Sequence, residues 1–98
     1  MWIASVSAAV EVTGNTLLEE CTTKRLSQTA CTRFLEGTIE GYRLGAATRT
    51  TICFPEKASL GKAKKVVVRY LRKNASKLDG SAAELVVRAL SEAWPCTR

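Results

Sequence analysis

Four cysteines are the residues of this 98-residue chain whose type and spacing first suggest chemistry. Their spacing is Cys21-x9-Cys31-x21-Cys53-x42-Cys96, without the close Cys-x-x-Cys pairs that zinc sites use. An even number of cysteines in a small domain indicates two disulfides and an oxidising compartment, with four free thiols or a metal site as the alternatives. We favour the pairs Cys21–Cys31 and Cys53–Cys96, although four cysteines allow three connectivities.

The chain contains no histidine, and this removes the commonest general base and the commonest metal ligand. Its serines and cysteines therefore lack the base that a nucleophilic triad requires. The carboxylate pair Glu36 and Glu40 lies among arginines on a predicted solvated helix face. Gly37, Gly41 and Gly45 lack the strand and the Lys-Ser/Thr pair of a phosphate loop. We predict no catalytic residue, no metal and no cofactor, and hence a binding protein rather than an enzyme.

Positive charge is concentrated in one segment of the chain. The formal net charge is +6, and residues 57–77 hold eight of the fifteen cations and no acid. Helical spacing places five of these cations on one face: Lys62, Lys65, Arg69, Arg72 and Lys73. Such a face contacts a protein partner, a nucleic acid or anionic lipid surface, or only water. The sequence offers few aromatics for base stacking, so nucleic acid is not the partner we expect.

The composition is that of one small globular domain, with 46% hydrophobic and 24% charged residues. No apolar run approaches the ~20 residues of a membrane span. The start of the chain is apolar and small, and Val6-Ser7-Ala8 resembles a signal-peptidase site. We expect residues 1–13 to be a flexible N-terminus or the remnant of a signal-peptide region, and residues 14–98 to form a single domain.

Capping signals and apolar periodicity predict an all-α fold. A first short helix begins at Asn15 or Thr16 and is followed by a polar loop, and a second covers residues 28–46. Ser59 caps a third helix that reaches residue 73, and Ser81 caps a fourth that ends before Pro95. An extended connector containing Cys53 separates the second helix from the third. We therefore expect a compact bundle of about four helices stapled by two disulfides.

Gly37, Gly41 and Gly45 repeat every four residues beside the apolar face of the second helix. Because each glycine inside a helix costs up to ~1 kcal/mol, three of them need a reason. We expect close packing of another backbone in the core, with a dimer seam or a ligand groove as the alternative.

Several motifs occur together in a fixed order, although none is specific alone. They are Gly14-Asn15-x-Leu17-Leu18-x-x-Cys21, Cys31-x-x-Phe34-x-x-Gly37-x3-Gly41, Cys53-x-Pro55, Val66-Val67-x-x-Tyr70-Leu71 and Ala89-Leu90-x-x-Ala93-x-Pro95-Cys96. As an ordered set they resemble the Rap/Tai immunity proteins of type VI secretion, which protect bacteria against peptidoglycan amidase toxins. This chain has Asn74-Ala75 where the family often has His-Pro.

The resemblance implies a small, helical, disulfide-containing periplasmic protein, often dimeric, that binds a cognate amidase effector and occludes its active site. An inhibitor needs a rigid surface rather than catalytic groups, and a basic face can steer it toward an acidic cleft. We expect the partner surface to comprise the basic helix and the loop that follows it: Lys65, Arg69, Arg72, Lys73, Asn74, Lys77 and Asp79. The alternatives are a stapled envelope accessory protein without a toxin partner and, with less support, a basic nucleic-acid-binding domain.

Overall fold

The structure is a computed structural model, and it describes residues 12–23, 25–45 and 51–96. These residues form α2 (Gly14–Thr22), α3 (Arg25–Gly45), α4 (Leu60–Lys73), the 3-10 helix η1 (Ala75–Lys77) and α5 (Ala82–Ala93). The all-α fold and the two disulfides are confirmed. The expected signal-peptide remnant falls largely on residues 1–11, which lie outside the described residues.

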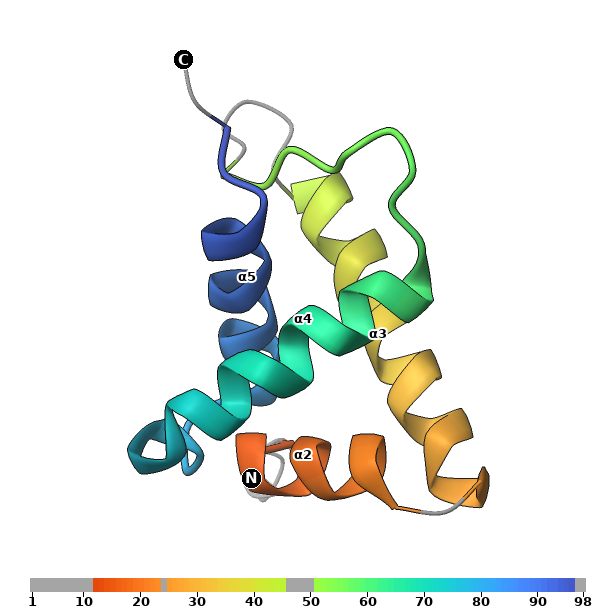
Figure 1. Ribbon diagram of the computed structural model, residues 1–98, viewed down its shortest axis with the longest axis vertical. Coiled ribbons are helices and arrows are strands. Elements are labelled where there is room, and N and C mark those ends of the chain that lie inside the picture. The colour runs from red at the N-terminus through yellow and green to blue at the C-terminus, as the bar shows by residue number, and fades with distance from the viewer. Residues whose placement is uncertain (1–11, 24, 46–50, 97–98) are drawn as a thin grey trace, which may run out of the picture.

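The helices pack around one apolar core. α3 and α5 run along the long axis of the molecule, α4 crosses in front of them, and α2 lies across one end (Figure 1). Each of these four helices contributes side chains that are almost completely buried, among them Leu17, Leu35, Leu71 and Leu90. A core shared by all four helices makes the basic helix α4 a rigid part of the scaffold.

α2 begins earlier than its sequence predicts. The N-cap is Thr13, whose side chain accepts from the Thr16 N–H, so the predicted capping by Asn15 or Thr16 is wrong. The Gly14 N–H donates to the Gly80 carbonyl at 3.1 Å, and this draws Gly14 into the helix. A Cβ on Gly14 would lie 2.5 Å from Leu85 Cδ1 and 3.0 Å from the Leu78 carbonyl oxygen, so the close approach requires glycine here.

α3 also begins earlier, at Arg25 rather than near residue 28, so most of the predicted polar loop is helical. The reason is a side-chain cap between the two helices. Gln28 Nε2 donates to the Cys21 carbonyl at 3.1 Å and to the Thr23 carbonyl at 2.9 Å. One side chain in the first turn of α3 thereby satisfies carbonyls at the end of α2, which shortens the link between them.

The later helix boundaries follow the sequence. Ser59 caps α4 by accepting from the Lys62 N–H, and Ser81 caps α5 by accepting from the Glu84 N–H. Residues 51–59 form no helix, as the β-branched residues and Pro55 predict. Within this connector, the Cys53 N–H donates to the Trp94 carbonyl at 2.8 Å, which sets the connector beside the end of α5.

The structure confirms the disulfide pairs Cys21–Cys31 and Cys53–Cys96, each with Cα atoms 5.0 Å apart. The first joins α2 to α3 and is buried, with the two cysteines 3% and 0% exposed. The second joins the connector to the chain after α5, and both of its cysteines are exposed. The two bridges therefore fix both ends of the bundle.

The expectation that the glycine repeat packs in the core is wrong. Gly37, Gly41 and Gly45 are exposed, and a Cβ at any of them would meet no heavy atom within 4 Å. Their neighbour Leu44 is 80% exposed. The glycines border the apolar face of α3 on its solvent side, and among the described side chains of this helix only Cys31 and Leu35 are buried.

Candidate partner-binding surface

α4 presents two chemically opposite faces. Val67, Tyr70 and Leu71 are buried in the core, and the cations between them along the chain point outward. Of the predicted partner-binding residues, those with exposed side chains are Lys65, Arg69, Arg72, Lys73, Lys77 and Asp79. A strongly amphipathic helix capped by Ser59 thus holds a row of cations on a backbone that the core keeps in place.

The cations of α4 form one wall of a groove of about 570 Å³. The opposite wall comes from the end of α2 and the first turns of α3, including Cys21, Thr22 and Gln28. Lys64 reaches across the groove and donates from Nζ to Gln28 Oε1. Among the described residues, five cations and no carboxylate line this hollow: Lys64, Lys65, Arg69, Arg72 and Lys73.

The predicted residues do not all share this groove. Arg69 and Lys73 form a ridge, because they also line a smaller hollow between α4 and α5 together with Asn74. Lys77 lies beyond the end of α4 and lines a third hollow against α5. The structure therefore brings Lys65, Arg69, Arg72 and Lys73 together in the groove. It places Lys77 outside the groove, in the hollow against α5.

Asn74 and Asp79 have structural contacts in the loop between α4 and α5. Asn74 ends α4, and its Nδ2 donates to the Tyr70 carbonyl at 2.8 Å. Asp79 accepts from Asn15 Nδ2 at 3.2 Å, and the Asn15 N–H donates to the Leu78 carbonyl. With Leu78 7% exposed, the loop is anchored to both α2 and the core. This loop is therefore held rigidly beside the row of cations on α4.

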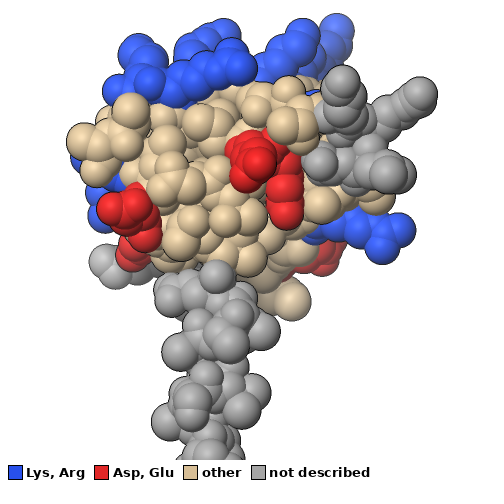
Figure 2. Space-filling view, turned by 90° about the horizontal axis from the view of Figure 1, so that it is seen from below, with Lys and Arg blue, Asp and Glu red and all other residues tan. Residues whose placement is uncertain are grey.

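Within the described residues, no acidic side chain neutralises the basic surface. Most Lys and Arg side chains of this view gather along one edge of the molecule, and the acidic side chains lie below that edge, some of them beside smaller basic groups on the flanks (Figure 2). Among the residues that the structure describes, no ion pair joins a carboxylate to these cations. An uncompensated cationic groove attracts acidic partners and raises their rate of association.

A fourth hollow, of about 230 Å³, was missed by sequence reasoning. It lies between α3, the connector and the ends of α4 and α5, with Phe54 and Trp94 among its walls. The two rings are 5.7 Å apart, centroid to centroid. One signal could have revealed it: Phe54 follows Cys53 and Trp94 closely precedes Cys96, so the favoured disulfide already implied that the rings are neighbours.

Comparison with known proteins supplies the family. A family model described as Rap1a immunity proteins matches residues 13–96, which is most of the chain. The chain belongs to the Rap1a immunity protein family. A search of curated proteins and a search of solved structures give no match.

Membership of an immunity protein family implies a toxin protein as the partner and suggests an inhibitor rather than an enzyme. The surface described above suits such a role, because it offers charge and rigidity. Within the described residues, no helix is both long and apolar enough to cross a bilayer. In the same part of the chain, no three His, Cys, Asp or Glu residues come together as a metal site would require.

Proposed function

We propose that this Rap1a immunity protein acts in the periplasm, where it binds a type VI secreted peptidoglycan amidase and occludes the active site of that enzyme. The observation that carries the proposal is the cationic groove beside an anchored loop, in a chain of the immunity family. The amidase surface that it fits carries acidic side chains around a cleft.

Charge supports the choice of surface. Arg69 lies on the ridge between two hollows, so its guanidinium is available from both sides. Arg72 lies in the basic groove and is exposed. Arginine presents planar donors that match a carboxylate in two hydrogen bonds, and it is enriched among residues that dominate interface energies.

Rigidity supports the mode of inhibition. Backbone hydrogen bonds from Gly14 to Gly80, and from Ala82 to Val12, hold both sides of the loop at residues 78–82. A loop already held in one conformation loses little entropy on entering a cleft. The loop is therefore suited to fill an active site beside the basic contact.

The disulfides support the compartment. All four cysteines are paired, and bridges of this kind persist in the periplasm and are rare in the cytosol. Peptidoglycan, the substrate of an amidase toxin, lies in the same compartment. The inhibitor and the enzyme would therefore meet where both are stable.

The experiment first searches the genes beside the one for this chain for an amidase, and then uses that enzyme, directed to the periplasm of a host cell, in a protection and binding assay. We expect co-expression of the immunity protein in the periplasm to prevent lysis, and the purified pair to form a stoichiometric complex without amidase activity. Arg69→Glu with Arg72→Glu should weaken binding at least about 100-fold, since each reversal replaces an attraction by a repulsion.

A matched control reverses two other exposed cations outside the predicted partner surface, Arg33→Glu and Lys57→Glu, which change the net charge equally. The control should bind as the wild type does, and both variants should keep the melting temperature of the wild type. Equal affinity of the groove variant and the wild type would refute the assigned surface. A lack of protection by the wild type would favour an envelope accessory role instead.

A further inference from the structure

The hollow of about 230 Å³ between α3, the connector and α5 combines apolar walls with a cation that is directed into it. Ile39, Leu60 and the buried Ala63 line it alongside the rings of Phe54 and Trp94. An apolar cavity of about 150 Å³ is large enough to hold a benzene ring. By size alone, this hollow therefore has room for one large apolar side chain.

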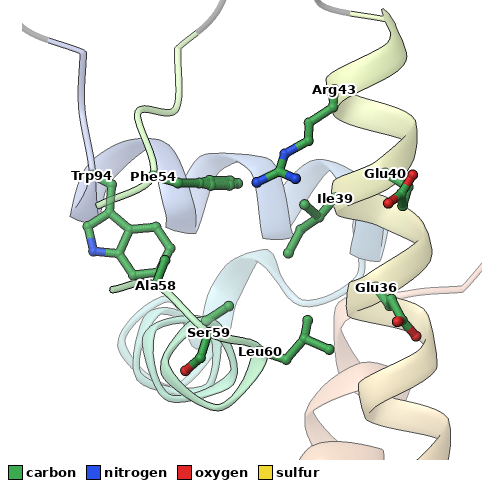
Figure 3. Close-up of a pocket in the computed structure, with 10 residues that line it drawn as sticks. Glu36, Ile39, Glu40, Arg43, Phe54, Ala58, Ser59, Leu60 and Trp94 are labelled. Carbon is green, nitrogen blue, oxygen red and sulfur yellow. The ribbon is translucent and has the colours of Figure 1, made fainter. Parts of the chain in front are cut away.

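Arg43 supplies the cation of this hollow. Figure 3 shows its side chain directed from α3 toward Phe54, whereas Glu36 and Glu40 point to the outer side of the same helix. The Cζ atom of Arg43 lies 4.7 Å from the centroid of the Phe54 ring, within the range of a cation–π contact. Among the described residues, no carboxylate or carbonyl accepts a hydrogen bond from this guanidinium. The ring therefore holds the guanidinium in place, and its N–H donors can bind an anion.

We propose that this pocket binds the C-terminal residue of a partner polypeptide, with the apolar side chain of that residue inside and its α-carboxylate on Arg43. The guanidinium lies beside the ring that forms an apolar wall, so the ligand must carry its anion close to its apolar group. A large apolar residue at a chain end joins both groups on one Cα, whereas an internal glutamate offers only two methylene groups to the apolar walls. Arginine binds a carboxylate through two parallel N–H donors, and this geometry fixes the orientation of the chain end.

This inference goes beyond the proposed function, because the pocket and the basic groove share no lining residue among those that the structure describes. The pocket lies at the start of α4, where Ser59 and Leu60 contribute to it, and the α4 wall of the groove begins with Lys64. Occupation of one therefore does not exclude occupation of the other. A partner that uses both binds more tightly than either contact alone allows, because the second contact forms within the same complex.

The pocket can be tested on the full chain without any toxin. The isotope-labelled protein is titrated with N-acetyl-phenylalanine, which carries a free carboxylate, and separately with its neutral amide, while the indole N–H signal of Trp94 is followed by NMR. The chain has two tryptophans, and a Trp2→Phe variant assigns that signal. We expect saturable shifts, with a dissociation constant about three- to fivefold lower for the carboxylate than for the amide, the ratio that exposed ion pairs give.

Two variants decide the role of the guanidinium. Arg43→Gln should make the acid and the amide bind equally, whereas Arg33→Gln, which removes the same charge from another exposed position of α3, should keep the preference. Circular dichroism should show both variants folded as the wild type is. The proposal is overturned by equal binding of the two compounds to the wild type, by a preference that survives Arg43→Gln, or by no shift at Trp94.

A third compound separates a chain end from an internal acidic side chain. N-acetyl-glutamate methylamide carries its carboxylate on the side chain, and we expect it to bind more weakly than N-acetyl-phenylalanine does. Tighter binding of the glutamate compound would overturn the proposal in favour of an internal acidic residue. Because these titrations contain no toxin, their failure leaves the protection assay to judge the proposed function separately.

Discussion

The hydroxyl of Tyr42 accepts the backbone N–H of Thr51 at 2.6 Å. It also accepts the Ile52 N–H at 3.1 Å, and the Thr51 hydroxyl bonds in turn to Ser91 at 3.0 Å. One phenol on α3 therefore fixes the start of the connector and, through it, the last turns of α5. This contact and the Cys53–Cys96 disulfide hold the connector in place. The connector forms one side of the hollow lined by Phe54 and Trp94, which we call the aromatic pocket.

The first prediction concerns the hydrogen bonds that the Tyr42 hydroxyl accepts from the connector. Tyr42→Phe keeps the ring and leaves two backbone donors without their acceptor, so we expect a loss of about 1 kcal/mol in the free energy of unfolding. In a domain of this size that corresponds to a fall of about 4–8 °C in the melting temperature, measured by circular dichroism. Thr38→Val also removes a hydroxyl from α3 and serves as the control. An equal loss of unfolding free energy in this control would show that the Tyr42 hydroxyl has no particular stabilising role.

The second prediction follows from the ionisation of the same group. Burial raises the pKa of the Tyr42 hydroxyl, but the hydrogen bonds from the Thr51 side chain and from the N–H groups of Thr51 and Ile52 together lower it below 10.0. The folded state then releases the phenolic proton at lower pH than the unfolded state does. The resulting stability is complete above the unfolded pKa and is lost as the pH falls through the folded pKa.

The stability difference between the wild type and Tyr42→Phe should therefore widen as the pH rises from neutrality toward 10.0. Urea unfolding at several pH values in this window measures it. Because the cysteines are all paired, no free thiol is present to start disulfide exchange at the alkaline end. A difference that stays constant or narrows with pH would contradict the lowered pKa.

How far the sequence predicts this molecule depends on whether a signal is local. Ser59 and Ser81 are good caps in front of amphipathic segments, and α4 and α5 begin where these residues predict. Asn15 and Thr16 are equally good caps, but Gly14 contacts Gly80 and Leu78, far along the chain, and this contact starts α2 at Gly14. A choice between adjacent caps is made by tertiary packing, which a local pattern does not contain.

The candidate site also has a part that local sequence patterns predict and a part that depends on tertiary packing. The cations of α4 share a face because of helical spacing alone, and their exposure is as predicted. Gln28 forms part of the opposite wall of the groove. The sequence predicts it at the boundary between a polar loop and the second helix, and its hydrogen bonds to the end of α2 could not be inferred from spacing. The aromatic pocket depends on the position of the connector, which is set by Tyr42 and the second disulfide together.

The third prediction concerns the order in which the disulfides are reduced. Cys53 and Cys96 are exposed, whereas Cys21 and Cys31 are buried, so a thiol reductant reaches the Cys53–Cys96 bridge first. Limited reduction followed by alkylation and peptide mass spectrometry should label Cys53 and Cys96 before the other pair. Because this bridge closes the longer loop, its loss should cost about 4 kcal/mol in the chain-entropy model. Labelling of Cys21 and Cys31 first would show that burial does not protect their disulfide from the reductant.

The fourth prediction contrasts Gly14 with the glycines of α3, because only Gly14 has close neighbours where a side chain would be. Gly14→Ala should destabilise the fold by about 1–3 kcal/mol, because the added methyl group meets Leu85 and the Leu78 backbone. Gly37→Ala and Gly41→Ala meet nothing within 4 Å, so each should stabilise α3 by up to about 1 kcal/mol. Chemical denaturation of the three variants, at matched protein concentrations, measures both signs. If the two α3 variants lose stability in proportion to dilution, this open face is instead covered by a second copy of the chain, since the stability of a dimer depends on its concentration.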